Sequence, residues 1–591
     1  MDRKSILVLG ASFALLFLWM SVLVPKIWPP TPAPPRTNIV ATVTNTLATG
    51  TNVPSPPVLT SNTNPAVTSL VPLVAPGSPE QTEKLESADA IYTFTSHGGG
   101  LKLVELKKYR ETVGRTGSTN SQPASLNTRA LAPVLALRGG AELTGDSLFR
   151  LTRTSPTGLR AEKILTNGLA LVKDFQIVSN YLVRATVRLE NRSAQPLALP
   201  AQSWVAGTAT PLGPRDDEMK LGIFWYDGGD LDHKDRAWFD DKSSGCSMGT
   251  PHLDFTAGSN NVVWAAMHNQ FFTIALMPGT NAIAATVSGR RIDLPAPTKE
   301  QIAADAKTVH DPHGLEATLG YPAVTLAAGE AQTREFTIYA GPKEYKRLSQ
   351  LPDKLDLVMD FGFFGFFSKA LLLSMNGLHA LGLGYGLAII AITVIIKLVF
   401  WPLTAASTRS MKRMQELQPQ MKAIQVKYKD DPVKMNKKTM EFMKENKVSP
   451  LGGCLPMALQ IPVFFGFFQM IQSAIELRGA RFLWATDLSQ SDTVFMLPGL
   501  DFPVNPLPII MGASMFWQAQ LTPPSPGMDP MQQKLMKYMP MMFLVFLYQQ
   551  PAGLTLYWTV QNFLTIVQMK LTKTKPAGPG TVTVVTPSKK K

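Results

Sequence analysis

One cation stands inside a long apolar run of this chain. The run covers residues 386–405, GLAIIAITVIIKLVFWPLTA, and Lys397 is its one charged residue. A charge inside a membrane span costs a few kcal/mol on insertion scales, so a residue of this kind usually serves a function. Thr393, Lys397, Thr404 and Thr408 recur at helical spacing, which puts them on one face of a helix. The pattern predicts a narrow polar stripe whose chemistry is electrostatic attraction.

The same lysine has a simpler interpretation. It precedes Trp401-Pro402 by only a few residues, and a lysine near the end of a span can extend its ammonium group to the lipid headgroups. This helix alone does not separate the two interpretations, so the other apolar runs must decide between them.

Polar side chains also recur in the last apolar runs. Trp558, Gln561, Asn562 and Thr565 are spaced by three, four and seven residues, so they share one helix face. Gln460 adds an amide in another run. Such groups often only join helices, at about 1 kcal/mol each. Together with Lys397, however, they form polar faces that cannot all pair with each other. This predicts a water-filled recess that attracts a polar or acidic segment, such as the hydrophilic flank of a nascent protein.

The sequence favours no bond-making chemistry. No grouping of Ser, His and Asp or of Cys and His stands out, and the two cysteines, Cys246 and Cys454, form no metal-binding pattern. The acidic loop at residues 227–235 offers oxygen ligands but lacks the spacing of a calcium loop. We therefore expect no catalytic residue, no metal and no cofactor. The predicted spans also lack carboxylates, which proton or sodium relays need.

Six apolar runs could cross a membrane. Basic residues surround them, so the formal charge of +14 is better explained by membrane orientation and anionic lipid than by nucleic acid. Both termini are then expected in the cytoplasm. The predicted spans are residues 6–24, 386–405, 451–475, 507–521, 538–548 and 554–571.

The soluble part lies between the first two spans. Residues 91–350 alternate apolar and polar side chains, which predicts an antiparallel β-sandwich outside the cytoplasm. An uncleaved signal-anchor span at 1–28 and a Pro, Thr and Ser-rich linker at 29–90 precede it. An amphipathic interfacial helix at 351–380 follows.

The remainder forms the predicted membrane core, residues 381–572, followed by a basic cytoplasmic tail at 573–591. Within the core, residues 405–450 read as a basic helical hairpin that breaks at Asp430-Asp-Pro432. Ribosomal RNA could bind there, although a solvated loop on the cytoplasmic side is the simpler expectation.

Three motifs carry a resemblance to a known family. They are PLGGCLPMALQIP at 450–462, DPMQQK at 529–534 and PAGLTLYW at 551–558. With the large β domain after a first anchor, the chain resembles the YidC/Oxa family of membrane protein insertases, in the form found in bacteria with an outer membrane.

The resemblance implies a multi-pass protein of the bacterial inner membrane with its β domain in the periplasm. It implies a five-helix core whose hydrophilic groove opens to the cytoplasm and to lipid. Nascent membrane proteins would be inserted and helped to fold there, alone or with the Sec translocon, and the ribosome is a candidate partner. Gln460 and Trp558 match groove positions of the family, and an arginine usually stands where this chain has Lys397.

Two other classes of function remain to be weighed. A solute transporter could use the outer β domain for capture, and it would need ion coupling inside the membrane. An assembly scaffold would use the β domain only to bind partners. The candidate groove residues that separate an insertase from both are Thr393, Lys397, Gln460, Trp558, Gln561 and Asn562.

Overall fold

The computed structural model describes two compact units, whose boundary along the chain falls between Val358 and Met359. The predicted anchor at 1–28, most of the linker and the tail at 573–591 lie outside the described residues. These are residues 73–113, 122–179, 181–213, 218–240, 251–280, 282–297, 312–446, 448, 455–497, 502–521, 538 and 542–572.

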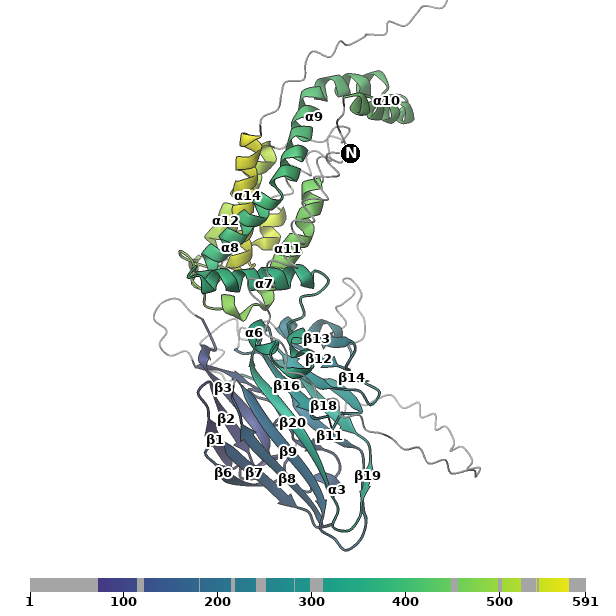
Figure 1. The fold of residues 1–591 in the computed structure, drawn as a ribbon, viewed down its shortest axis with the longest axis vertical. Helices are drawn as coiled ribbons and strands as arrows, with labels where there is room; N and C mark the ends of the chain where they lie inside the picture. The colour runs from purple at the N-terminus through teal and green to yellow at the C-terminus, as the bar shows by residue number, and fades with distance from the viewer. Residues whose placement is uncertain are drawn as a thin grey trace, which may run out of the picture. The chain divides into compact units, whose positions relative to one another are not determined.

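The first unit is rich in antiparallel strands, as predicted (Figure 1). Its largest sheet has the strand order β13-β12-β15-β16-β20-β9-β8-β7-β6. At its centre Ala185 of β9 lies opposite Phe336 of β20, and both side chains are buried. The strands of this sheet are β6 (Arg150–Ser155), β7 (Gly158–Ile164), β8 (Leu169–Ile177), β9 (Leu182–Asn191), β12 (Gly222–Tyr226), β13 (Leu231–Asp235), β15 (Trp264–His268), β16 (Phe272–Pro278) and β20 (Ala331–Pro342).

Three smaller sheets complete this unit. One has the order β14-β17-β18-β11-β5, another β1-β2-β3-β4, and the last pairs β10 with β19. Their strands are β1 (Thr82–Glu86), β2 (Ala90–Thr95), β3 (Gly100–Arg110), β4 (Pro123–Leu126), β5 (Leu137–Arg138), β10 (Leu197–Leu199), β11 (Gln202–Ala209), β14 (Asp254–Ala257), β17 (Thr286–Asp293), β18 (His313–Tyr321) and β19 (Val324–Leu326).

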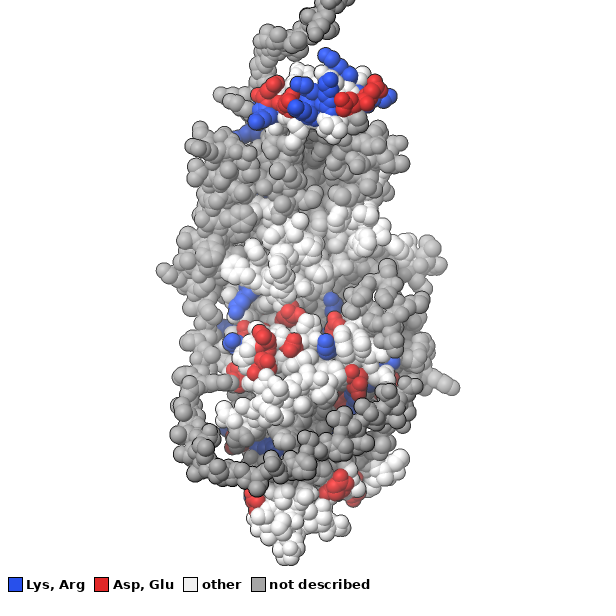
Figure 2. All heavy atoms as spheres, turned by 90° about the vertical axis from the view of Figure 1, so that its right-hand side faces the viewer, with Lys and Arg blue, Asp and Glu red and all other residues white. Residues whose placement is uncertain are grey.

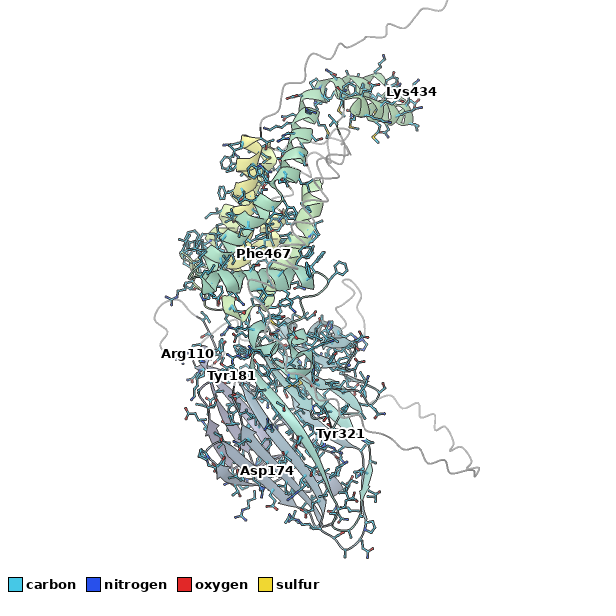
Figure 3. All side chains as sticks on the ribbon, in the orientation of Figure 1. Arg110, Asp174, Tyr181, Tyr321, Lys434 and Phe467 are labelled. Atoms are coloured by element: carbon cyan, nitrogen blue, oxygen red, sulfur yellow. The ribbon has the colours of Figure 1, made fainter. Side chains whose placement is uncertain are left out.

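The five-stranded sheet packs on the largest sheet. Gly207 of β11 sits at a register shift with φ +145°, and a Cβ there would lie 2.7 Å from the Met267 side chain. This close approach of β11 to β15 needs a glycine. Tyr321 of β18, labelled in Figure 3, contacts the facing strand β20 through the Arg334 guanidinium, which lies 4.2 Å from its ring centroid.

The β unit starts earlier than predicted. β1 (Thr82–Glu86) pairs with β2 inside the segment assigned to the linker. Leu85 is the one fully buried residue of this edge strand, and charged side chains on an edge strand oppose pairing with other chains. Because four of its five residues are polar, composition alone resembles that of a linker.

A buried lysine lies in the core of the β unit. Lys173 of β8 has no exposed surface, and its Nζ donates to the carbonyl oxygens of Gly98 at 2.7 Å and Leu135 at 2.8 Å. The Nζ also lies 4.4 Å from the centroid of the Phe149 ring. Burial lowers the pKa of Lys173 to about 7, because an apolar core disfavours the ammonium form.

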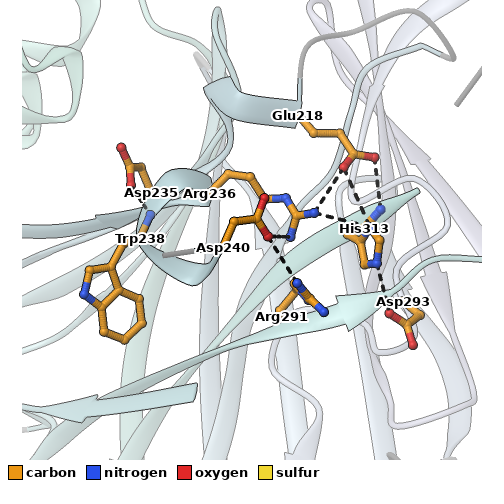
Figure 4. A network of polar contacts seen from close by, with 8 residues as sticks. All are labelled: Glu218, Asp235, Arg236, Trp238, Asp240, Arg291, Asp293 and His313. Atoms are coloured by element: carbon orange, nitrogen blue, oxygen red, sulfur yellow. Dashed lines mark hydrogen bonds and ion pairs between the residues drawn. The ribbon is translucent and has the colours of Figure 1, made fainter. Parts of the chain in front are cut away.

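A polar network joins short elements of this unit (Figure 4). Arg236, in α4 (Arg236–Phe239), lies 3.2 Å from an oxygen of Asp240, which also accepts from Arg291 at 3.1 Å. Glu218, in η2 (Glu218–Lys220), accepts from the backbone N–H of His313 at 3.0 Å. These paired charges connect β17 and β18 to the segments that precede β12 and follow β13. The other short helices of the unit are α3 (Ala141–Thr144) and α6 (Tyr345–Leu348).

The second unit is helical. α7 packs against α11 and α8, and α14 packs against α8, α11 and α12; Figure 1 shows α7 lying across the direction of the other helices. The helices are α7 (Gly365–Ala380), α8 (Tyr385–Val399), α9 (Trp401–Lys427), α10 (Pro432–Glu445), α11 (Leu455–Ser473), α12 (Pro506–Leu521) and α14 (Ala552–Leu571), with η5 (Ile475–Leu477) and the short strands β21 (Phe495–Leu497) and β22 (Phe502–Val504) between α11 and α12.

Two predicted helices are interrupted. The stretch at 351–380 consists of η3 (Pro352–Met359) and then α7; Asp360 and Gly362 between them have positive φ, which a helix cannot continue through. The helix expected over 386–405 breaks at Phe400, because Pro402 has no backbone N–H and is favoured in the first turn of a new helix, here α9.

The basic hairpin is present as predicted. α9 ends at Lys427, and α10 begins after Asp431, whose side chain caps it by accepting from the backbone N–H of Lys434 at 3.0 Å. Met414 and Leu417 of α9 form a small apolar cluster with Phe442 of α10. The two helices therefore pack together as one element.

None of the described helices has, by itself, the length and apolar content needed to cross a membrane. α8 and α9, bent by 64° at their junction, meet these criteria when they are taken together. The six spans therefore remain a prediction.

The Lys173 site predicts a pH-dependent stability. The folded β unit binds fewer protons than the unfolded chain between pH about 7 and the ordinary lysine pKa of 10.5, so stability should rise with pH across this window, by at most about 1.4 kcal/mol per pH unit. Thermal unfolding followed by circular dichroism, with the full chain in detergent, measures this slope. Lys173→Met should flatten it; equal slopes in the two proteins would contradict the assignment.

Candidate functional site

The candidate site is organised around α14. This helix begins directly after Pro551, and its first two N–H groups donate to the loop between α11 and α12: Ala552 N to Gln490 O at 2.6 Å and Gly553 N to Leu488 O at 2.9 Å. These bonds satisfy donors that have no partner within the helix. The polar face of α14 is therefore held at a fixed position relative to its neighbours.

Lys397 points toward α14. The residue, in the last turn of α8, is 5% exposed, and its Nζ donates to Thr565 Oγ1 at 2.8 Å. Thr565 Oγ1 in turn donates to the carbonyl of Gln561 at 2.7 Å. No carboxylate pairs with Lys397 within the described part of the chain. The ammonium group thus lies inside the helical unit instead of extending outward from the end of α8.

The amides continue this chain of contacts. Gln561 Nε2 donates to Gln460 Oε1 at 2.9 Å, and Gln460 Nε2 donates to the Tyr557 hydroxyl. The Tyr557 ring is buried and stacks on Phe467, with centroids 4.1 Å apart; Phe467 is labelled in Figure 3. The series Lys397, Thr565, Gln561, Gln460 and Tyr557 is called the polar ladder below.

The other candidate residues lie beside the ladder. Asn562 is 5% exposed and its Nδ2 donates to Ser514 Oγ of α12 at 2.9 Å. Trp558 contacts the Phe464 ring edge-on at a centroid distance of 4.6 Å. Thr393 is 1% exposed and donates to the carbonyl of Ile389, one turn back in its own helix. Thr393 thus makes a local hydrogen bond and takes no part in the ladder.

The sequence analysis missed two members of this polar system. Tyr557 belongs to the ladder, and the buried Gln568 donates to Thr404 Oγ1 of α9 at 2.6 Å and to the carbonyl of Trp401 at 3.2 Å. Tyr557 precedes Gln561 by four residues, and Gln568 follows it by seven. Extending the same helical spacing by one turn in each direction would have found both.

One premise of the predicted recess needs correction. The recess was inferred because the polar faces seemed unable to pair with each other, but Gln460 pairs with Gln561, Asn562 with Ser514, and Gln568 with Thr404. Pairing of amides and hydroxyls across helices is a sufficient reason for these residues. A water-filled recess therefore remains a prediction that depends on Lys397.

The acidic loop forms a turn. Asp227 Oδ1 accepts from the N–H groups of Gly229 at 2.8 Å and Asp230 at 2.7 Å, and these backbone hydrogen bonds lower the pKa of the Asp227 carboxyl. The described residues contain no group of three or more His, Cys, Asp or Glu side chains arranged to hold a metal ion.

Comparisons with known proteins identify the family. The sequence model described as "60Kd inner membrane protein" matches residues 377–577, and the one described as "YidC periplasmic domain" matches residues 86–373. The chain is also similar to proteins curated as membrane protein insertase YidC. That of Pelobacter propionicus is 32% identical over 502 residues, 83% of this chain and 86% of the relative.

A second such relative, from Maridesulfovibrio salexigens, is 31% identical over 593 residues, 96% of this chain and 98% of its own length. A solved structure of an active YidC insertase shares 16% identity, covering 84% of this chain and 95% of that chain with a TM-score of 0.34. On the sequence matches, this chain belongs to the YidC family of membrane protein insertases. It is accordingly an inner-membrane protein with a periplasmic β-rich domain and a C-terminal helical region.

The contact between Lys397 and Thr565 predicts a stability effect. Thr565→Val keeps the shape of the side chain but removes the acceptor of the buried ammonium group, so it should destabilise the helical unit by roughly 1.5–3 kcal/mol. Thr565→Ser, which keeps the hydroxyl, is the matched control. Thermal unfolding of the purified proteins in mild detergent compares them. Equal unfolding temperatures for the Val and Ser variants would show that this hydrogen bond does not hold Lys397.

Proposed function

We propose that this chain inserts proteins into the inner membrane and helps them fold, and that it does so without forming or breaking covalent bonds. The observation that supports this proposal is a buried cation whose described partner is a neutral hydroxyl, Thr565. A carboxylate partner would cancel the charge, whereas a hydroxyl leaves its field in place. The ammonium group can therefore attract an acidic or polar flank of a client protein.

The size of this attraction is adequate for the task. Two opposite unit charges 4 Å apart interact by about 4 kcal/mol at an effective dielectric constant of 20. Moving a charged side chain to the centre of a membrane helix costs roughly 2.5–3.5 kcal/mol on insertion scales. A single fixed cation can thus offset most of the cost for one acidic residue of a client while that residue crosses.

The rest of the polar ladder suits transient binding. Hydrogen bonds between side chains of membrane helices contribute about 0.6–2 kcal/mol each, so Gln460 and Gln561 can exchange their mutual bond for one to a client backbone at little cost. Trp558, against Phe464, adds an aromatic surface for the apolar part of the client. Binding of this strength releases the client once its span has formed.

We further propose the six-span arrangement with both termini in the cytoplasm and a groove around Lys397 open to that side and to lipid. The hairpin supports this orientation: residues 409–445 contain ten Lys or Arg against five Asp or Glu, and basic loops remain in the cytoplasm. Figure 2 shows basic side chains gathered at the hairpin end, with acidic ones among them. Exposed lysines of α10, such as Lys434 and Lys438, would contact anionic lipid headgroups or the ribosome.

The clients are nascent membrane proteins, delivered directly or by way of the Sec translocon. The transporter hypothesis receives no support from the relatives, which are curated as insertases. The assembly-scaffold hypothesis gives no reason for a buried cation in the helical unit.

The proposal predicts the effect of reversing the charge at residue 397. Lys397→Glu should lower insertion of a single-span client with an acidic flank at least about tenfold, because losing even 1.4 kcal/mol of attraction corresponds to that factor. A client with a neutral flank should lose less. Protease protection of the translocated flank in proteoliposomes, at equal amounts of insertase, measures both.

Lys397→Arg is the matched control and should retain most of the activity, since it keeps the cation. Normal insertion of the acidic client by Lys397→Glu would exclude the proposed role of this charge.

A further inference from the structure

The loop between α11 and α12 carries an exposed apolar surface. Phe495, Met496 and Leu497 of β21 are 52%, 40% and 37% exposed, and Phe502 of β22 is 47% exposed. Every residue of the two strands is apolar. The tight turn Phe482–Ala485 in the same loop adds Leu483, 74% exposed, and Trp484, 38% exposed. The side chains Leu483, Trp484, Phe495, Met496, Leu497 and Phe502 are called the loop patch below.

The loop patch is built on a fixed polar base. Asp492 Oδ2 accepts from Trp484 Nε1 at 2.9 Å and from the N–H of Leu507, in the first turn of α12, at 2.6 Å. One carboxylate, in the segment just before β21, thus joins the turn to the start of a helix. Tyr548 stacks on Phe502 with centroids 5.1 Å apart, and its hydroxyl donates to the carbonyl of Pro503 at 2.7 Å.

The polar contacts beneath the loop patch leave its apolar side chains exposed on the surface of the helical unit. Asn505 is fully buried; its Nδ2 donates to the Tyr548 carbonyl at 2.8 Å and its Oδ1 accepts from Thr493 at 2.7 Å. The Asn505 amide therefore points inward and is paired, whereas the apolar side chains of the loop patch are exposed, which is the reverse of a water-facing surface. An exposed apolar surface held rigidly in this way is typical of an interaction site.

The surface is continuous along the chain with that of α12. Ile509 and Ile510, one turn into this helix, are 48% and 37% exposed, and Phe516 and Trp517 further along are 40% and 43% exposed. In an inner-membrane protein, exposed apolar helix surface faces lipid. The loop patch therefore starts at the level where α12 enters the bilayer.

We propose that the loop patch inserts into the headgroup region of the membrane leaflet at which α12 begins, and that its partner is the lipid surface. Two features favour lipid over water. The patch contains Trp and Phe, which favour the membrane interface, and Arg481 beside it is exposed and suits lipid phosphates.

The hairpin lies at the interface and not deeper. Its strands form a two-stranded sheet, so each has an edge whose backbone groups face outward, and such groups are not tolerated in the hydrocarbon core. Water and headgroups satisfy them at the interface. The patch would then fix the depth of α12 in the bilayer. Through Asp492 and the loop it would also fix the depth at which α14 starts.

Spin labelling tests the location directly. Cys246 and Cys454 are replaced by Ser, and single cysteines are introduced at Met496, at Leu483 and, as the water-exposed control, at Thr154 of β6. All three positions are exposed, so the labels should not disturb folding. In proteoliposomes the collision rate of each label is measured with oxygen, which concentrates in the bilayer, and with a water-soluble nickel chelate. The ratio of the oxygen rate to the nickel rate should be several-fold higher at 496 and 483 than at 154.

A nickel accessibility at Met496 and Leu483 equal to that at Thr154 would place the patch in water and overturn the proposal. Low accessibility to both reagents would also overturn it, because it would indicate a protein surface covering the patch. No client protein is used, so this result and the insertion result can fail independently.

Discussion

An ammonium group buried among apolar helices must have an acceptor, and this requirement fixes the centre of the helical unit. Lys397 meets it with the hydroxyl of Thr565, which can happen only if α8 and α14 are close together and α14 has one rotation about its axis. That rotation directs Gln561 to Gln460 on α11 and Asn562 to Ser514 on α12. The rotation of α14 that the contact between Lys397 and Thr565 requires is thus the same rotation that pairs α14 with α11 and α12.

The buried lysines of the two units differ in the number of hydrogen-bond acceptors around the ammonium group. In the β unit Lys173 has two backbone carbonyls and aromatic rings around its ammonium group, so its charge serves the local structure. In the helical unit Lys397 has one described acceptor, although an ammonium group has three N–H donors. A cation with spare donors is suited to receiving a ligand, and this difference is the physical basis for assigning Lys397 a function and Lys173 a structural role.

Local chemistry made much of the fold predictable. Asp431 and Pro432 marked the turn of the hairpin, because one caps a helix and the other starts it, and period-two alternation marked the strands around β9 and β20. The break at Phe400 was less visible, since the apolar run continues through it and only Pro402 signals a change of direction. The charged strand β1 was missed because its one buried residue, Leu85, gives no periodicity.

The sequence predicts most of the residues of the candidate site but not which of them contact each other. Helical spacing placed Gln561 and Asn562 on the same helix face as Trp558, but spacing does not say which neighbouring helix each one meets. The partner of Lys397 depends on how α8 lies against α14 and on the rotation of α14 about its axis, both of which arise from tertiary packing. For the same reason the mutual pairing of Gln460 with Gln561 could not be foreseen from either residue alone.

In the proposed mechanism a client passes along the polar ladder beside Lys397. Site-specific photocrosslinking from position 460 or 558 to a ribosome-stalled nascent membrane protein tests it most directly, with a crosslinker at exposed Thr154 of the β unit as the reference. We expect crosslinks from 460 and 558 that move along the client as its stalled length increases. Crosslinks absent from both positions, with the client still inserted, would contradict it.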